Sequence, residues 1–337
     1  MPNLYELNQL LLSKLREWRD TLFNLNEKIN FNGRSNDVLA IGELLIDMIA
    51  TDYKDSGKYQ RYFGGAPANI AMNINKLGAN SKIASAVGSD YLGDFLIDSL
   101  TKDSVDIDLI QRVEESTSMV MLNRSNGTPI PIFYRGADYQ LKYNINLEDS
   151  LKNSKIMHFS AWTISKMPIR ETMEKLIHVA RENNTLICFD PNYHELLWDR
   201  NENGIDYIKS IISKSDIVKP SEDDAERIFG KDNHFNQLGK FLKLGAKLVV
   251  MTLGKEGLIA ATDKEFFEYK TLATKVADTT GAGDAFWAGF YTALVKGYTI
   301  KDAVVLGSAT SAYKLKSVGA IVDLPRLEVL KKMYVDS

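Results

Sequence analysis

The sequence is poor in the residues that disulfides, metal centres and nucleic-acid surfaces need. Only one of its 337 residues is cysteine and only four are histidine, and the histidines lack the spacing of metal ligands. A single cysteine, Cys188, excludes an internal disulfide and a thiolate metal site, which fits a reducing cytoplasm. The net charge is −3 without any basic stretch, so neither nucleic acid nor an anionic membrane is an expected partner. Because no apolar run approaches the roughly 18 residues of a membrane span, we expect neither a transmembrane helix nor a signal peptide.

Apolar residues are plentiful by contrast. They make up 45% of the chain, enough for one large α/β domain or one domain with an appendage. Residues 4–29 carry leucines and a tryptophan at helical spacing and end at a polar break. We therefore predict that residues 1–36 form an amphipathic helical extension, which packs on the body or on a second subunit rather than on a membrane. Residues 37–337 would form the main domain.

Apolar strands alternate with helices from residue 37 onward. Val38–Ile41 is a continuous apolar strand of the kind that is buried on both faces, and later strands and helices follow with short polar joints. This pattern predicts an α/β fold with a doubly wound, mostly parallel sheet flanked by helices. Strands within residues 48–63 and 116–134 interrupt the alternation, and Ser125–Thr128 is a strong hairpin turn.

The interrupting strands predict a small β-sheet lid over one end of the main domain. Their apolar residues alternate with polar or small ones and include Val120, Leu122, Ile130 and Ile132. So small a sheet has too little core of its own to leave an apolar face in water. We therefore expect two copies of the chain to pair through the lid as a homodimer. Arg135 and Asp138, just beyond the lid strands, are candidate substrate contacts.

The most informative stretch is Asp278–Phe286, which joins a glycine-rich turn to an apolar helix predicted from Ala285. Free backbone N–H groups at a helix N-terminus bind anions, and Gly281 and Gly283 let the backbone approach a ligand closely. Asp284 would repel a phosphate there unless it takes a proton from an attacking hydroxyl. An ordinary first turn with a favourable aspartate is the alternative. The dinucleotide fingerprint lacks its sixth-position glycine, and no Gly-Lys pair is followed by the Ser or Thr of a Walker motif.

Further polar residues fall where the predicted strands end. Parallel strands in an open α/β sheet present their carboxyl ends at one edge, where ligands bind. The residues expected at this edge are Asp47, Asp190, Asn192, Lys219, Ser221, Asp224 and Thr252. Ser221 and Asp224 also have the spacing of a capping box, and capping is the stronger interpretation of that segment taken alone.

These motifs resemble the ribokinase-like (PfkB) carbohydrate kinases over about residues 37–325. The resemblance rests on Gly64–Ala71 with Val87–Gly93 downstream, and on Asp278–Phe286. It implies an ATP- and Mg²⁺-dependent sugar kinase in which Asp284 is the catalytic base. It further implies an anion hole of Gly281, Ala282 and Gly283, and sugar contacts from Asp47, Gly64, Gly65, Asn69 and Arg135. The nucleotide contacts would be Lys219, Ser221, Thr252, Gly254, Gly257 and Ser308, and the metal ligands Asp224 and Asp278, with Asp278 in the family's loop for a monovalent cation such as K⁺.

The sequence departs from the family pattern in two segments. The usual Asn-x-x-Glu appears as Ser221–Asp224, and an Asn common beside the adenine is Ser308. Asp190–Trp198 and Phe133–Asp138 most resemble fructokinases, so D-fructose, phosphorylated on a primary hydroxyl, is the expected substrate. A 2-keto-3-deoxygluconate kinase is the alternative within the family. A non-catalytic sugar-binding or regulatory protein on a kinase scaffold is the alternative from another class.

Overall fold

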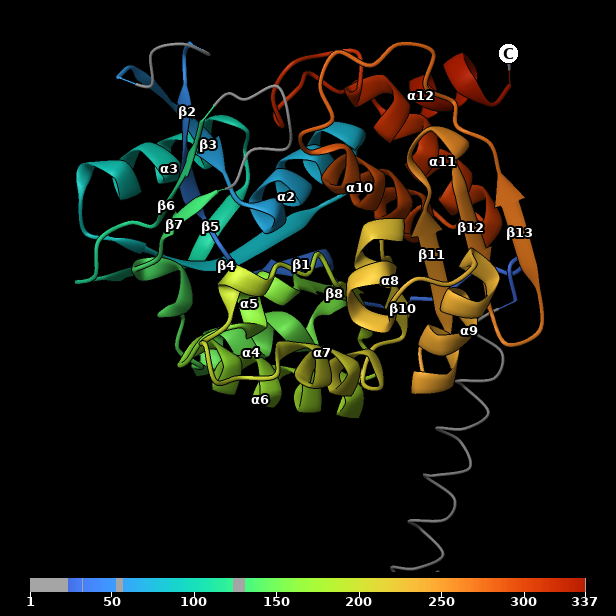
Figure 1. The fold of residues 1–337 in the computed structure, drawn as a ribbon, viewed down its shortest axis with the longest axis horizontal. Helices are drawn as coiled ribbons and strands as arrows, with labels where there is room; N and C mark the ends of the chain where they lie inside the picture. The colour runs from blue at the N-terminus through green and yellow to red at the C-terminus, as the bar shows by residue number, and fades with distance from the viewer. Residues whose placement is uncertain (1–23, 32, 53–56, 124–130, 337) are drawn as a thin grey trace, which may run out of the picture.

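A computed structural model describes residues 24–336 with the exception of 32, 53–56 and 124–130. In this part of the chain nine strands form the larger sheet, namely β1 Asn36–Ile41, β4 Ser81–Gly88, β5 Asp106–Val113, β8 Ser154–Ser160, β9 Leu186–Asp190, β10 Ile217–Val218, β11 Leu248–Thr252, β12 Leu258–Ala261 and β13 Phe266–Tyr269. Their order is β13-β12-β11-β10-β9-β8-β1-β4-β5 (Figure 1). The strands from β5 to β11 are parallel, and β12 and β13 extend one edge in antiparallel orientation. The predicted doubly wound, mostly parallel sheet is confirmed.

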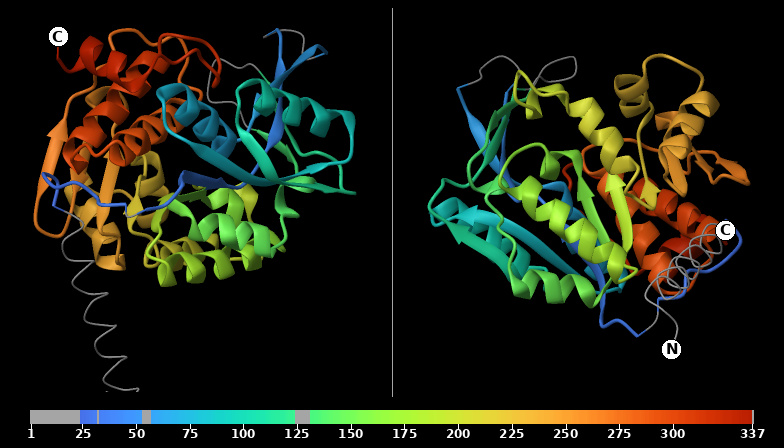
Figure 2. Two further views of the ribbon diagram at one scale, coloured as in Figure 1. Left: turned by 180° about the vertical axis from the view of Figure 1, so that it is seen from behind. Right: turned by 90° about the horizontal axis from the view of Figure 1, so that it is seen from below.

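Helices cover both faces of this sheet (Figures 1 and 2). One face carries α2 (Ala66–Leu77), α10 (Ala282–Val295), α11 (Ile300–Lys314) and α12 (Leu327–Tyr334), and the other carries α4 (Ile145–Lys152), α6 (Ile169–Glu182), α7 (Gly204–Ile212), α8 (Glu222–Phe229) and α9 (His234–Leu244). Strand β1 contributes to both layers, since Leu39 and Ile41 enter the core under α6 and Val38 enters the core under α10. No helix in these described ranges is long and apolar enough to cross a membrane.

Helix α10 lies at the centre of its layer and is apolar on all sides. Every residue from Ala285 to Leu294 is buried, because the helix packs on α2 and α11 as well as on the sheet. A helix without a polar face has to be enclosed by protein. This enclosure fixes the position of its N-terminus, which carries the glycine turn.

A separate four-stranded sheet lies beside one end of the larger sheet (Figure 1). Its strands are β3 (Tyr59–Gly64), β2 (Leu45–Ala50), β6 (Met119–Leu122) and β7 (Ile132–Tyr134), in that spatial order. Strands β6 and β7 pair in antiparallel orientation, as the hairpin signal predicts. The turn itself lies outside the described residues. Helix α3 (Tyr91–Lys102) packs with α2 against the base of this small sheet.

The pairing register corrects the apolar face expected for the small sheet. Val120 pairs with Phe133, whereas Ile132 pairs with Met121, so Val120 and Ile132 point to opposite faces. The Phe133 ring packs edge-on against Trp162 at 5.1 Å, which turns its face toward the body of the protein. Ile132 on the other face is 53% exposed. Alternation within single strands could not show this, because it does not tell which residues of two strands pair.

The described part of the N-terminal region is not helical. Residues 24–29, expected at the end of an amphipathic helix, form a turn and a short bridge. The backbone N–H of Leu25 donates to the Glu265 carboxylate at 2.6 Å, and Lys28 pairs with Thr299. These bonds replace the i→i−4 bonds of a helix and place Leu25 in the core with 1% exposure. The rest of the expected helix lies outside the described residues.

Candidate active site

The N-terminus of α10 is a glycine turn, as the sequence predicts. Gly281 precedes the helix with a φ of 76°, in the left-handed region that favours glycine. A Cβ atom on Gly281 would lie 2.9 Å from the Cα of Ala320, so no larger residue fits. The helix begins at Ala282, earlier than the expected start at Ala285, and this places Asp284 inside its first turn.

The turn presents free backbone donors. The N–H of Ala282, expected to contribute to an anion hole, instead donates to the carbonyl of Thr279 at 3.1 Å. Among the described residues, the N–H groups of Gly281, Gly283 and Asp284 have no acceptor. Free N–H groups at a helix N-terminus form a site for a phosphate or another anion.

Asp284 is held at this turn by the neighbouring helix α2. The Nδ2 atom of Asn69 donates to the Asp284 carboxylate at 2.9 Å, which joins the two glycine segments recognised in the sequence. Burial raises the pKa of Asp284 to about 6, and the charge of Asp190 acts in the same direction. The Asn69 hydrogen bond and the charges of Lys219 and Lys314 oppose that shift. A carboxylate whose pKa lies near the working pH is suited to general-base catalysis.

A lysine lies on the cavity side of the same turn. Lys219, directly after β10, is 4% exposed, and its Nζ atom lies 3.2 Å from the carboxylate of Asp190. A Cβ atom on Gly283 would lie 3.6 Å from this ammonium group, so the lysine and the turn can contact one anion together. The indole N–H of Trp287 also donates to Asp190, at 2.7 Å. Trp287 was missed from the sequence, although its i+3 spacing from Asp284 places both on one helix face.

A cavity of about 790 Å³ opens in front of the turn. This volume is within the usual range for a small-molecule site. The predicted residues that line it are Gly281, Ala282, Gly283, Asp284, Lys219, Ser221, Asp224, Thr252, Gly254, Gly257 and Ser308. At Gly257, φ is 106° and a Cβ atom would lie 2.0 Å from the carbonyl oxygen of Tyr269, so only glycine fits this wall.

The expected sugar contacts lie on the other side of Asp284. A Cβ atom on Gly64 would lie 2.6 Å from the Asp47 carboxylate, and Gly65 with φ of 115° approaches the carbonyl of Glu43 as closely. Burial raises the pKa of Asp47 to about 7, with a further contribution from the charge of Asp284. The Oδ1 atom of Asn69 is buried without a partner in the described structure, and this leaves an acceptor for a ligand hydroxyl.

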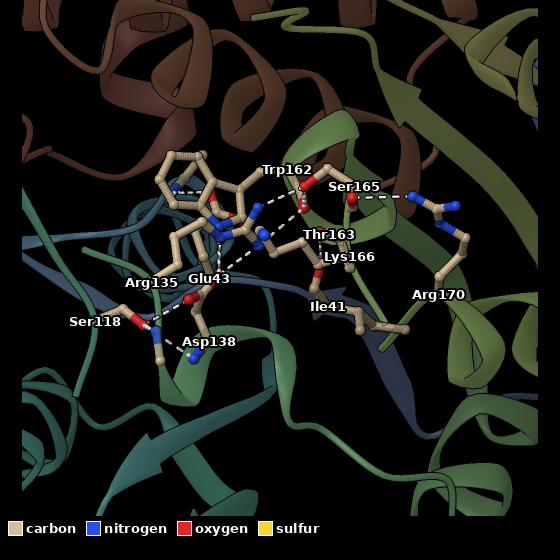
Figure 3. Close-up of polar contacts among 12 residues, drawn as sticks. Ile41, Glu43, Ser118, Arg135, Asp138, Trp162, Thr163, Ser165, Lys166 and Arg170 are labelled. Carbon is tan, nitrogen blue, oxygen red and sulfur yellow. Dashed lines mark hydrogen bonds and ion pairs between the residues drawn. The ribbon is translucent and has the colours of Figure 1, made fainter. Parts of the chain in front are cut away.

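Arg135 takes part in a network at this end of the site (Figure 3). Its Nε and Nη2 atoms donate to the Asp138 carboxylate at 2.8 and 2.6 Å, and Nη1 donates to Ser165 at 2.6 Å. Asp138 also accepts hydrogen bonds from the indole of Trp162 at 2.7 Å and from Ser118 at 2.5 Å. The guanidinium group is therefore neutralised within the protein. Contact between Arg135 and a substrate stays a prediction.

Comparison with known proteins agrees with this geometry. Residues 35–327 match the family described as pfkB family carbohydrate kinase. The chain belongs to this family. The kinase is 54% identical over 316 residues to an ATP-dependent 6-phosphofructokinase of Thermoanaerobacterium thermosaccharolyticum, with 93% of this chain and 98% of that protein covered. It is therefore a phosphotransferase that acts on a sugar, which removes the non-catalytic alternative.

Two solved structures show the same architecture. The fructokinase of Halothermothrix orenii is 37% identical, with a TM-score of 0.72 and coverage of 85% of this chain and 99% of that chain. A fructokinase of Vibrio cholerae O395, solved with fructose, ADP and calcium ion bound, is 26% identical, with a TM-score of 0.78 and coverage of 89% and 99%.

The segment expected to organise Mg²⁺ is a capping box in the kinase. Ser221 Oγ accepts the N–H of Asp224 at 3.1 Å, and the Asp224 carboxylate accepts the N–H of Ser221 at 3.0 Å, which confirms the capping interpretation. The other carboxylate oxygen of Asp224 accepts the N–H of Tyr193 at 2.8 Å. No cluster of three His, Cys, Asp or Glu in the described residues could hold a metal ion. Ligation of Mg²⁺ by Asp224 stays a prediction.

The segment expected to bind a monovalent cation is occupied by protein groups. The Asp278 carboxylate accepts the N–H groups of Thr280 at 2.9 Å and of Gly319 at 2.8 Å. The Asp278 carbonyl accepts a hydrogen bond from the ammonium group of Lys314 at 2.8 Å. These contacts do not fit a metal ion bound at Asp278. Lys314 was not recognised in the sequence.

Replacement of Asp284 tests the assignment of the catalytic base. Asp284→Asn keeps the shape and removes the basicity, so we expect kcat to fall by about 10²–10⁴ while sugar and ATP still bind. Asp302→Asn is the matched control, because Asp302 has the same position in the first turn of α11 and accompanies no anion site. If the Asp284→Asn variant keeps more than about a tenth of kcat, Asp284 is not the base.

The pH profile tests the environment of this carboxylate. Asp284 acts as a base only when it is ionised, and its pKa is about 6, so kcat/KM should fall as the pH decreases through that value. The measurement is kcat/KM for the sugar with Mg-ATP saturating at each pH. A midpoint near the ordinary aspartate value of about 4 would contradict the raised pKa.

Proposed function

We propose that this kinase transfers the γ-phosphoryl group of ATP to a primary hydroxyl of a fructose unit. The observation that carries the proposal is Asp284, held by Asn69 beside free N–H groups at the end of a large cavity. The hydroxyl oxygen attacks the γ-phosphorus, its proton passes to the Asp284 carboxylate, and the bond to the bridging oxygen breaks to release ADP. The N–H groups of Gly281 and Gly283 and the ammonium group of Lys219 stabilise the charge on the transferred group.

The nucleotide lies in the cavity in this proposal. The part of the cavity lined by Thr252, Gly254 and Ser308 would face the adenosine. Lys219 would lie nearest the γ-phosphate, because it adjoins Gly283. Mg²⁺ bound to the triphosphate would neutralise the charge of the β- and γ-phosphates. The Vibrio cholerae fructokinase, with fructose, ADP and calcium bound together, supports such an arrangement.

The preferred acceptor in the proposal is fructose 6-phosphate, phosphorylated on its remaining primary hydroxyl. The support is the sequence identity of 54% with a protein named ATP-dependent 6-phosphofructokinase, in an alignment that covers almost the whole of both chains. This preference replaces the D-fructose expected from the sequence motifs alone. A protein-bound phosphate needs cationic partners. The basic residue of the lid strands, Arg61 in β3, pairs with Met48 and lies over the Phe95 ring, on the face opposite Asp47, so it does not supply one from the same chain.

D-Fructose is a second candidate that the geometry of the acceptor end favours. The guanidinium group of Arg135 is already paired with Asp138. Burial raises the pKa of Asp47 to about 7, so this carboxyl group is partly ionised at neutral pH and would repel the 6-phosphate of the acceptor. A neutral sugar meets no such repulsion. The identity of 37% with the Halothermothrix orenii fructokinase supports the same candidate.

Relative kcat/KM values decide between the acceptors. If the site recognises the 6-phosphate, fructose 6-phosphate should exceed fructose by about 100-fold or more, because buried partners of the phosphate are left unpaired by the neutral sugar. Coupled ADP release should be measured for both sugars, for 2-keto-3-deoxygluconate and for 5-dehydro-2-deoxygluconate. A reversed ratio selects the fructokinase, and turnover of neither fructose compound refutes the proposal.

We further propose that two copies of the kinase pair through the small sheet, which acts as a lid over the acceptor. Its face with Ile132 and Tyr134 also carries Met48, Met121 and Arg61, and Ile132 and Tyr134 are each 53% exposed in a single chain. Its opposite face carries Asp47, which pairs with Tyr62 and Val120 in the register. One face is thus turned to the site, and the other is available to a second copy.

A charge placed on the outer face should separate the copies. We expect the unchanged kinase to be a dimer at micromolar concentration and Ile132→Lys to be a monomer, because a dimer would bury the unpaired lysine. Ile145→Lys is the control, since Ile145 is 63% exposed at the start of α4, outside the lid. Light scattering with size-exclusion chromatography gives both masses, and a monomeric unchanged protein would refute the pairing.

A further inference from the structure

A lysine is fully buried behind the anion site. Lys314 is the last residue of α11 and has 0% exposure. Lysine is almost never fully buried without a partner, because removal of its ammonium group from water is costly. Burial accordingly lowers the pKa of Lys314, and the charges of Asp278 and Asp284 oppose that shift. No step of the proposed reaction uses this residue.

The contacts of Lys314 identify what its ammonium group stabilises. Its Nζ atom donates a hydrogen bond to the carbonyl of Asp278 at 2.8 Å. Within the described residues, this carbonyl is the hydrogen-bond acceptor of the ammonium group. In the same segment the N–H of Gly319 donates to the Asp278 carboxylate at 2.8 Å, and the carbonyl of Leu315 accepts the N–H of Ala277 at 2.7 Å. Residues 314–320 thus hold the start of the glycine turn at three points.

The same segment also fixes the end of the turn. Ala320 packs so closely on Gly281 that a Cβ atom there would lie 2.9 Å from the Ala320 Cα. The direction of the free N–H groups of Gly281 and Gly283 therefore depends on where residues 314–320 lie. The charge of Lys314 reaches the catalytic carboxylate as well, since it favours the ionised form of Asp284.

We propose that the ammonium group of Lys314 is a built-in cation that positions the anion site, so that this kinase has no need of a free monovalent cation at Asp278. The inference rests on the proposed phosphoryl transfer. Lys314 is a positioning residue, because it contacts the Asp278 carbonyl and not the reacting atoms. A free cation at this place would have to displace an ammonium group that is already bonded to the carbonyl.

The test compares variants of Lys314 in buffers that differ only in the monovalent cation. Lys314→Met keeps most of the volume and removes the charge, and Lys314→Ala leaves room for a small ion. Lys316→Met is the matched control, because Lys316 is exposed two residues further on and lies over the ring of Tyr334. Turnover should be measured in tetramethylammonium, K⁺ and NH₄⁺ chlorides at equal ionic strength, together with the Kd of ATP by calorimetry and the melting temperature.

We expect the unchanged kinase and Lys316→Met to be indifferent to the cation. In Lys314→Met, kcat should fall about 10- to 100-fold, the loss expected from a misplaced catalytic group, and ATP should bind more weakly. Lys314→Ala should recover part of its activity in K⁺ or NH₄⁺ and none in tetramethylammonium, which is too large for the space. A purely structural lysine would lower the melting temperature without any recovery by a cation.

Three results would overturn the inference. They are activation of the unchanged kinase by K⁺, full kcat in Lys314→Met, and a loss of activity in Lys314→Ala that no small cation restores. If Lys314→Ala fails to fold, Lys314→Gln keeps an N–H donor for the Asp278 carbonyl without the charge, and full kcat in that variant also refutes the role of the cation. The Kd of ATP needs no turnover, so it tests this inference even if the proposed acceptor is wrong.

Discussion

The site depends on keeping a carboxylate ready to ionise beside groups that bind anions. The N-terminus of α10 attracts negative charge, but enclosure by protein disfavours the ionised form of Asp284. Asn69 from α2 offsets part of this cost with one hydrogen bond, and it can do so only if the N-terminal ends of two helices meet. Two features bring these helix ends together. Helix α10 is apolar on all sides and so packs closely on α2, and Gly65 and Gly281 allow close backbone contacts at the two turns. The packing of α10 on α2 therefore determines whether Asn69 can donate its hydrogen bond to Asp284.

Local and periodic signals in the sequence predicted much of this arrangement. The glycine turn, the helix after it and the capping box at Ser221 each depend on residues a few positions apart, whose geometry is set by the backbone alone. The parallel sheet follows from apolar strands that alternate with helices, and it brings polar strand ends to one edge. For that reason Lys219 and Thr252, far apart in the chain, were correctly expected beside one cavity.

Features that depend on tertiary contacts were missed or misplaced. The bond between Lys314 and Asp278 joins residues 36 positions apart, and the bond between Trp287 and Asp190 joins residues 97 positions apart. No spacing rule identifies such pairs. Strands β5 and β12 and helices α4 and α12 gave no signal strong enough to be recognised, and the faces of the lid depended on a register that single strands do not contain. Residues 24–29 have helical spacing but bond to Glu265 and Thr299 instead, because tertiary packing outweighs intrinsic propensity.

Two lysines on opposite sides of the turn favour ionisation of Asp284, the carboxylate proposed as the catalytic base. Burial and the charge of Asp190 would together favour the protonated acid, which cannot accept a proton from a sugar. Lys219 acts from the cavity and Lys314 from behind the turn, and both favour the ionised form. In the proposed complex Lys219, which lines the cavity, shares its charge with the phosphate, whereas Lys314 is outside the lining of the cavity and bonds to the Asp278 carbonyl. The buried lysine can therefore keep its effect on Asp284 when the nucleotide binds, at the moment when the added negative charge would otherwise favour protonation of the base.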